Sequence, residues 1–203
     1  MTLSADPLYL DCHISLDGTT IERVRRLNRR VVDLAGGGID FSTGALIPHL
    51  TLFMGLFPPS REARVRRAVD DLAGRFAPLD LAFGGMEVAR DGYVFLRVAP
   101  TEALRGWHAR VVAALDPLRE GLVRQKFRDR RTDYSPDEQA RIDRYGFPWV
   151  LEAWRPHVTI GFVDPARQPD VLAGLGEPSF TGRAVAIALG PVGEHGTVQE
   201  TTP

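Results

Sequence analysis

The sequence contains little cysteine and no long apolar run. Cys12 is the only cysteine, which excludes an internal disulfide and a metal site built from several thiolates. Its place within an alternating apolar pattern predicts a small buried residue and not a nucleophile. Because the apolar stretches are short and interrupted, we expect no membrane association and no signal peptide, and the sequence predicts a soluble, cytoplasmic monomer.

An excess of charge of one sign is also lacking. Lysine and arginine together number 25, aspartate and glutamate 26, and the formal net charge is −1. The chain therefore lacks the positive field that would hold a long nucleic-acid duplex through phosphate neutralisation alone, and a small or terminal phosphate is a better partner. Lys126 is the single lysine, and this bias toward arginine fits either genome composition or a need for planar phosphate-binding groups.

With 203 residues, of which 44% are hydrophobic, the chain can form one globular domain or two joined lobes. Apolar alternation and helical spacing in the first half predict strand, helix, strand, helix and strand, over 8–16, 19–35, 47–53, 60–76 and 79–88. The order repeats in the second half, over 92–98, 101–119, 158–163, 165–174 and 180–189, with a last strand at 197–201. The two halves look like copies, and residues 1–203 are expected to form a single unit of two lobes.

One short motif stands at the same point of both halves. Pro48-His49-Leu50-Thr51-Leu52 in the first half corresponds to Pro156-His157-Val158-Thr159-Ile160 in the second. Residues two apart on a strand point to one face, so each motif presents an imidazole beside a hydroxyl. If the halves pack about a pseudo-twofold axis, both pairs line one cleft and converge on one tetrahedral group, which suits a phosphate.

His49 and His157 can divide the work of proton transfer between them. One neutral imidazole can take a proton from the attacking water or hydroxyl, while the other, protonated, gives one to the leaving oxygen. The hydroxyls of Thr51 and Thr159 can hydrogen-bond the charged phosphate oxygens. Packing of both histidines in the core and a metal site are the alternatives. The motifs lack the second histidine or the carboxylate that would complete a metal shell, so no metal is expected.

The two framed motifs resemble those of the two-histidine (2H) phosphoesterase superfamily, which includes bacterial 2′-5′ RNA ligases and cyclic nucleotide phosphodiesterases. The resemblance covers nearly the whole chain as an order of elements, and its specific residues are few. It implies an α+β fold, a bilobal pseudo-twofold duplication with an antiparallel sheet in each lobe, helices outside and a central cleft. It also implies chemistry without a metal or other cofactor, with His49, Thr51, His157 and Thr159 as the catalytic residues.

An insertion precedes the motif strand of the second half, at residues 121–155, where the first half has a short connection. It begins with a basic run over 124–131, and Ser135 and Glu138 then predict a capping box for a helix that ends near Gly146. One interpretation is a lid that brings arginines to a phosphate and aromatic residues to a base or ribose. The other is a solvated excursion whose basic run is balanced by acidic residues, namely Asp129, Asp133, Asp137 and Glu138.

Four further residues are candidates for binding the substrate. Arg155 precedes the second motif histidine by two positions and can bind a phosphate or another anionic group, or lie in solvent. Tyr93 and Phe95 share one face of their strand, where they can stack on a base or serve only in packing. Tyr9 lies on the polar face of the first strand together with His13, and both can line the cleft or serve a structural role.

The sequence therefore predicts a metal-independent phosphoesterase that hydrolyses a cyclic phosphodiester (2′,3′- or 1″,2″-cyclic) or a 2′-5′ linkage of a nucleotide or RNA end. A 2′-5′ RNA ligase uses the same proton-transfer groups and stays open, as does a nucleotide-binding module without turnover. An enzyme of phosphonate or phosphoribosyl metabolism is a third alternative, because residues 145–157 are similar to the region before the second motif in a branch associated with phosphonate-degradation genes. His108 and His195 are assigned no chemistry.

Overall fold

Residues 6–89 and 91–199, which the computed structural model describes, form one sheet of six strands in the order β2-β1-β6-β3-β4-β5. The strands are β1 (Leu8–Leu16), β2 (His49–Phe57), β3 (Leu79–Val88), β4 (Tyr93–Val98), β5 (His157–Phe162) and β6 (Ser179–Pro191). Neighbouring strands pair antiparallel throughout. The α+β class and the antiparallel pairing expected from the sequence are confirmed.

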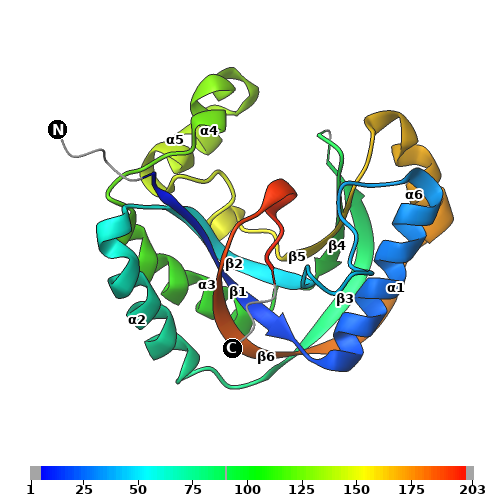
Figure 1. The fold of residues 1–203 in the computed structure, drawn as a ribbon, viewed down its shortest axis with the longest axis horizontal. Helices are drawn as coiled ribbons and strands as arrows, with labels where there is room; N and C mark the ends of the chain where they lie inside the picture. The colour runs from blue at the N-terminus through cyan, green and yellow to red at the C-terminus, as the bar shows by residue number, and fades with distance from the viewer. Residues whose placement is uncertain (1–5, 90, 200–203) are drawn as a thin grey trace.

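Four helices among the described residues cover the outer face of the curved sheet (Figure 1). They are α1 (Gly18–Ala35), α2 (Glu62–Ala73), α3 (Glu102–Leu115) and α6 (Gln168–Leu175). Helix α1 packs on α6 at one side of the molecule, and α2 packs on α3 at the other. Within the same described ranges, no helix is long and apolar enough to cross a membrane. The concave face of the sheet is thus left for a site.

The motif strands divide their side chains between the two faces. Leu50 and Leu52 of β2, and Val158 and Ile160 of β5, are buried in the core that the sheet forms with α3 and α1. Because alternate residues of a strand point to opposite faces, the histidine and threonine of each motif turn to the concave side. Burial of the intervening apolar residues therefore orients the polar pair.

Pairing registers repeat between the two halves of the sheet. His49 of β2 lies opposite Ser15 of β1, and His157 of β5 lies opposite Arg97 of β4. Both strand pairs contain an irregularity at the equivalent place, just before His13 in β1 and just before Phe95 in β4. The order of elements in the two halves repeats as well.

The structure differs from the expected arrangement of one sheet per lobe. Strand β6 of the second half pairs with β1 of the first, and β3 of the first half pairs with β4 of the second. The pairing of β3 with β6 then joins the strands into a single sheet. Each half therefore completes its part of the sheet with a strand from the other half.

Strand β1 is more enclosed than its alternating pattern predicted. Its second face was expected to be polar and half-open, but Asp11 and His13 are as buried as Cys12. The segment after β6 returns across the concave side (Figure 1, red). There Val198 forms an isolated β-bridge with Val192, and Gln199 forms another with Leu46. These bridges replace the strand predicted at 197–201, of which 200 and 201 lie outside the described residues.

A buried histidine connects α3, β2 and the end of the insertion. The Nδ1–H of His108 donates to the carbonyl oxygen of Leu52 at 2.6 Å, and its Nε2 accepts from the N–H of Leu151 at 2.7 Å. The ring stacks on Trp154 at 4.3 Å. These partners require the neutral ring, and burial lowers the pKa of His108 to about 4, against the opposing effect of the Leu52 carbonyl.

Acid should destabilise the fold through this histidine. Its pKa is about 4 in the folded state and 6.5 in the unfolded chain, so the stabilisation is complete above pH 6.5 and is lost as the pH falls toward 4. The loss at pH 4 amounts to about 3 kcal/mol. A His108→Gln variant, which keeps a donor and an acceptor but does not titrate, should show a shallower fall in urea-unfolding free energy between pH 6.5 and 4. Equal slopes in the variant and the wild type would contradict the assignment.

Candidate active site

A cavity of about 340 Å³ opens on the concave side of the sheet. Thr51 of β2 lines it together with His157 and Thr159 of β5. Strands β2 and β5 are the two edges of the sheet, yet they contain Cα atoms within 8 Å of each other. The curvature of the sheet therefore brings three of the four motif side chains to one cavity, while His49 is 9% exposed and does not line it.

The two motif histidines share one local geometry. Nδ1 of His49 lies 3.0 Å from the carbonyl oxygen of Ile47, and Nδ1 of His157 lies 2.7 Å from that of Arg155. In both motifs this carbonyl belongs to the residue before the proline, a position that the proline ring holds extended. Because a carbonyl only accepts, Nδ1–H donates in both rings, and the lone pair of each neutral imidazole is at Nε2. In both rings Nε2 is thus the nitrogen that does not face the backbone carbonyl.

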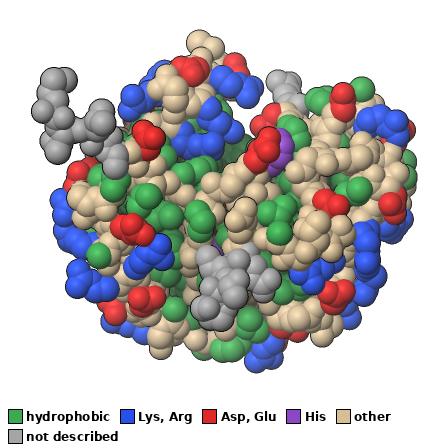
Figure 2. All heavy atoms as spheres, in the orientation of Figure 1, with side chains coloured by type: hydrophobic (Ala, Val, Ile, Leu, Met, Phe, Trp, Pro, Cys, Tyr) green, Lys and Arg blue, Asp and Glu red, His purple; other side chains and the backbone are tan. Residues whose placement is uncertain are grey.

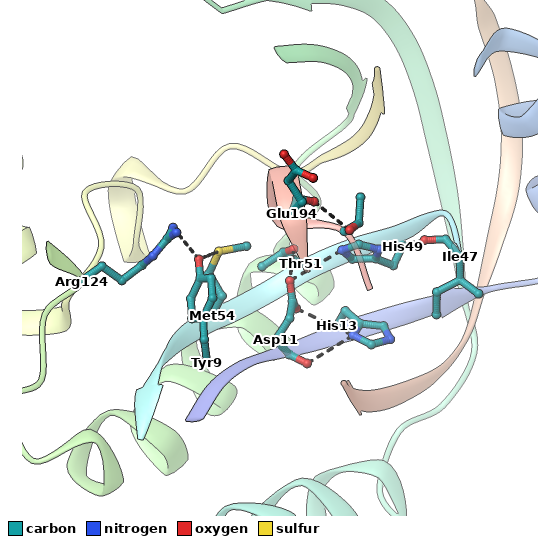
Figure 3. A network of polar contacts seen from close by, with 10 residues as sticks. Tyr9, Asp11, His13, Ile47, His49, Thr51, Met54, Arg124 and Glu194 are labelled. Atoms are coloured by element: carbon teal, nitrogen blue, oxygen red, sulfur yellow. Dashed lines mark hydrogen bonds and ion pairs between the residues drawn. The ribbon is translucent and has the colours of Figure 1, made fainter. Parts of the chain in front are cut away.

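The buried carboxylate of Asp11 lies beside the first motif (Figure 3). Oδ2 of Asp11 accepts a hydrogen bond from the Thr51 hydroxyl at 2.6 Å and lies 3.6 Å from Nε2 of His49. Oδ1 of Asp11 lies 3.7 Å from Nδ1 of His13, whose ring is 5.0 Å from the ring of His49. A fully buried carboxylate is costly unless a positive charge lies beside it. His49, whose Nε2 lies beside Oδ2, is a neighbour that can supply such a charge.

The second motif has an aromatic residue at the equivalent place. Asp11 lies opposite Met54 in the β1–β2 pair, and Tyr93 lies opposite Phe162 in the β4–β5 pair. Each pair is found five residues beyond its motif histidine, so the registers correspond. His157 therefore lacks the carboxylate that His49 has at this register position.

The pKa values of the histidines separate accordingly. Burial lowers the pKa of His49, but the hydrogen bond and charge of Asp11, with the Ile47 carbonyl, raise it further, so the net shift is upward. For His157 burial lowers the pKa, and the effects of the Arg155 carbonyl and neighbouring charges do not restore it. Burial also lowers the pKa of His13, to about 4. The pKa values of the two motif histidines thus shift in opposite directions, upward for His49 and downward for His157.

The other expected binding residues lie around the cavity in different ways. Tyr93 and Phe95 line it with nearly parallel rings 5.9 Å apart, and Phe95 also packs 4.2 Å from the ring of His157. Tyr9 lines it too. The guanidinium of Arg155 is largely exposed and lies 3.7 Å from a carboxylate oxygen of Glu87, so its carbonyl, which holds His157, is the better-defined contribution.

Several residues in or beside the cavity had no role in the sequence analysis. Asp11 was only one of the polar residues of β1, and nothing in its neighbourhood in sequence marks it as a partner of His49. His195, to which no chemistry was assigned, lines the cavity and stacks on Phe162 at 3.9 Å. The insertion supplies a further group of lining residues, Arg124, Lys126, Phe127, Tyr134, Phe147 and Trp149. Only the basic and aromatic character of the insertion pointed to them.

The insertion has the local structure that its sequence predicts. Ser135 and Glu138 form the capping box of α5 (Pro136–Tyr145), which ends at Gly146 with φ of 73°. A short helix, α4 (Gln125–Asp129), precedes it. The buried side chain of Arg119 donates to the carbonyls of Leu122 and Arg144 and so ties the two ends of the insertion together. Within the described part of the chain, no group of three or more His, Cys, Asp or Glu residues is placed to hold a metal ion.

The fold and the paired His-x-Thr motifs are those of a two-histidine phosphoesterase. Within that class the chain belongs to the 2′-5′ RNA ligase superfamily, whose family model matches residues 19–190. TT0787 of Thermus thermophilus has the same fold, with 16% identity over 95% of this chain and 94% of that chain and a TM-score of 0.63. E. coli LigT in its apo form is 14% identical over 98% and 96%, with a TM-score of 0.54.

E. coli LigT complexed with ATP is also similar, with 14% identity over 97% of this chain and 96% of that chain and a TM-score of 0.50. A comparison with curated proteins found no match. At these identities the solved structures show the fold alone.

The separation of the two histidine pKa values can be measured directly. In NMR titrations of the ring carbons, His49 should titrate above the ordinary histidine value and His157 below it. Asp11→Asn removes the charge beside His49 and should lower the pKa of His49 markedly, while His157, which has the Arg155 carbonyl as its nearest partner, should change little. A pKa of His49 that stays unchanged in a folded Asp11→Asn protein would show that the carboxylate has no such effect.

Proposed function

We propose that the protein is a phosphoesterase that hydrolyses a cyclic phosphodiester of a nucleotide or RNA end, with His49 and His157 as its acid–base pair. The observation that carries the proposal is the pair of equivalent imidazoles, each held through Nδ1 and each followed by a threonine that lines one cavity. His157 lines that cavity as well, and Nε2 of His49 lies beside Asp11. Two titratable groups with opposite pKa shifts at one site suit proton transfer in both directions. Binding alone requires only hydrogen-bond donors.

In the proposed reaction water attacks the phosphorus of a 2′,3′-cyclic phosphate. Nε2 of His157 takes a proton from the water as its oxygen bonds to phosphorus. The bond between phosphorus and one ribose oxygen breaks, and Nε2–H of His49 gives its proton to that oxygen, which leaves a monoester. Thr159 donates a hydrogen bond to a phosphate oxygen that carries the developing charge. Each turnover restores the starting protonation when a proton passes back from His157 to His49 through solvent.

Asp11 supports this division of roles. Its charge favours the protonated form of His49, which an acid needs, and Tyr93 provides no such charge at the equivalent register position of the second motif. The hydroxyl of Thr51 donates its hydrogen bond to Asp11 in the free protein. When His49 is protonated beside Asp11, a bound phosphate can accept this hydrogen bond in place of the carboxylate.

The cavity also supports a nucleotide as the substrate. Its aromatic lining offers flat faces for a base, and its volume of about 340 Å³ lies at the lower end of the range of small-molecule sites. The complex of E. coli LigT with ATP is in keeping with this class of ligand. Hydrolysis of a 1″,2″-cyclic phosphate or of a 2′-5′ linkage, and 2′-5′ ligation by the reverse reaction, use the same proton-transfer groups. A binding module without turnover and an enzyme of phosphonate or phosphoribosyl metabolism are the remaining alternatives.

A substrate panel in the presence of a chelator tests the proposal. The panel contains 2′,3′-cyclic nucleotides, ADP-ribose 1″,2″-cyclic phosphate and 2′-5′-linked oligonucleotides. Release of a monoester should continue without metal, and His49→Ala and His157→Ala should each lower kcat by at least about 100-fold. The dependence of kcat/KM on pH should be a bell, and Asp11→Asn should move its alkaline limb to lower pH because that limb reports His49.

Other outcomes of the panel assign other functions. Activity that disappears in chelator and returns with a divalent ion would replace the two-histidine mechanism with a metal-dependent one. Joining of 2′-5′ ends without hydrolysis would identify a ligase. Tight binding of a cyclic nucleotide without turnover, in protein with both histidines intact, would identify a binding module.

The insertion is expected to determine specificity and not chemistry. Replacing residues 124–146 with a short Gly-Ser linker removes Arg124, Lys126, Phe127 and Tyr134 from the cavity wall while leaving β2 and β5 in place. KM for the best substrate of the panel should rise by about tenfold or more, the size of one lost charge-assisted contact. A ribose 2′,3′-cyclic phosphate that lacks a base should be affected much less. Equal KM for the best substrate in the folded variant would leave the insertion without a role in binding.

A further inference from the structure

The structure divides the basic run of the insertion into two groups. Arg130 pairs with Asp133 at 2.7 Å and Arg131 with Asp143 at 2.7 Å, on the outer surface of the insertion. Arg128 is exposed and does not line the cavity. Arg124 and Lys126, in contrast, are partly buried and line the cavity that also contains His157. Figure 2 shows Lys and Arg side chains gathered at the rim of the hollow beside α4 and α5.

Arg124 and Lys126 form a pair of like charges. Among the ion pairs of the described residues, none includes either side chain. Burial lowers the pKa of Lys126, and the positive charge of Arg124 lowers it further, an effect that the charge of Asp91 does not cancel. Two partly desolvated cations side by side repel each other, and an anion bound between them relieves that repulsion.

The positions of the two cations are well defined by aromatic neighbours. The guanidinium of Arg124 lies over the ring of Tyr9 at 4.2 Å and donates to the Tyr9 hydroxyl at 2.8 Å (Figure 3). Nζ of Lys126 lies 5.5 Å from the centre of the Phe127 ring, which is itself buried. These contacts leave further N–H groups of both side chains free to donate. Pre-organised donors of this kind bind an anion without a large loss of side-chain entropy.

The wall of the cavity combines three kinds of residue. It contains the proton-transfer group of the second motif, the two cations of the insertion, and aromatic rings, among them Tyr93, Phe95 and Trp149. A phosphate at the motifs and a base against the aromatic rings account for the first and third kinds. The two cations are then left for a second anionic group of the same ligand.

We propose that Arg124 and Lys126 form a subsite for a second phosphoryl group, so that the preferred substrate is a nucleoside cyclic phosphate carrying a further phosphate, such as a 5′-phosphate. This proposal rests on the proposed function, because that function places the cyclic phosphate at the motif histidines. The acidic residues of the cavity wall, Asp91 and Glu194, disfavour an anion that is not held by both cations. The substrate class is therefore set by two phosphate positions and a base.

The test compares two substrates that differ in one group. Adenosine 2′,3′-cyclic phosphate with a free 5′-hydroxyl is measured against the same compound with a 5′-phosphate. The wild type should prefer the 5′-phosphorylated compound by about 10- to 100-fold in kcat/KM, mainly through KM. Arg124→Gln and Lys126→Gln should each remove most of this preference. Arg128→Gln, which removes the same charge from the exposed surface two residues beyond Lys126, should keep it.

The outcomes separate the subsite from the proposed chemistry. Equal kcat/KM for the two substrates in the wild type would overturn the subsite while leaving the hydrolase intact. A loss of preference in Arg128→Gln as large as in Lys126→Gln would also overturn it, because net charge alone would then explain the effect. If neither compound is turned over, calorimetry with adenosine 2′-monophosphate and adenosine 2′,5′-bisphosphate replaces kinetics. Tighter binding of the bisphosphate, abolished by Lys126→Gln, would support the subsite, and equal binding would reject it.

Discussion

The approach of the two edge strands of the sheet is the constraint on which the site depends. β2 and β5 stand at opposite ends of the strand order, and an edge strand ordinarily offers unpaired backbone groups to another chain. Here the sheet curves until these edges approach each other across the cavity. Each edge carries its histidine and threonine on the concave face because the residues between them are buried under the helices. Curvature and alternation together therefore produce a two-sided site from two copies of one short motif.

The local features of this architecture were readable from the sequence, and the long-range ones were not. The motifs, the alternation around them and the capping box at Ser135 depend on residues close together in the chain. The place of β6 between β1 and β3 depends on pairing between distant segments, which no local pattern records. Asp11 was hidden for the same reason, since only the curvature and the segment after β6 enclose a face that reads as polar. The arginines of the insertion are a similar case. Whether each one forms an ion pair or lines the cavity depends on which acidic side chains lie close to it in space.

Duplication alone yields two equivalent imidazoles, whereas the chemistry proposed here needs two different ones. In both rings Nδ1 lies against the carbonyl oxygen two residues earlier, so the two imidazoles have the same backbone contact. The difference comes from one register position, where the first half has a carboxylate and the second an aromatic ring. A buried charge acts strongly over a few ångströms in a medium of low polarity. One residue is therefore enough to give the two copies different proton affinities without altering the scaffold.

The exchange of strands between the halves has a consequence for biosynthesis. β1 leaves the ribosome before any other strand described here, but one of its two neighbours, β6, leaves after all the others. Until β6 has been synthesised, one edge of β1 and one edge of β3 have no strand to pair with. Contacts of such long sequence separation form slowly and expose strand edges to aggregation meanwhile. Although the chain repeats its elements, neither copy can mature on its own, and the nascent protein presents open strand edges to chaperones until translation has passed β6.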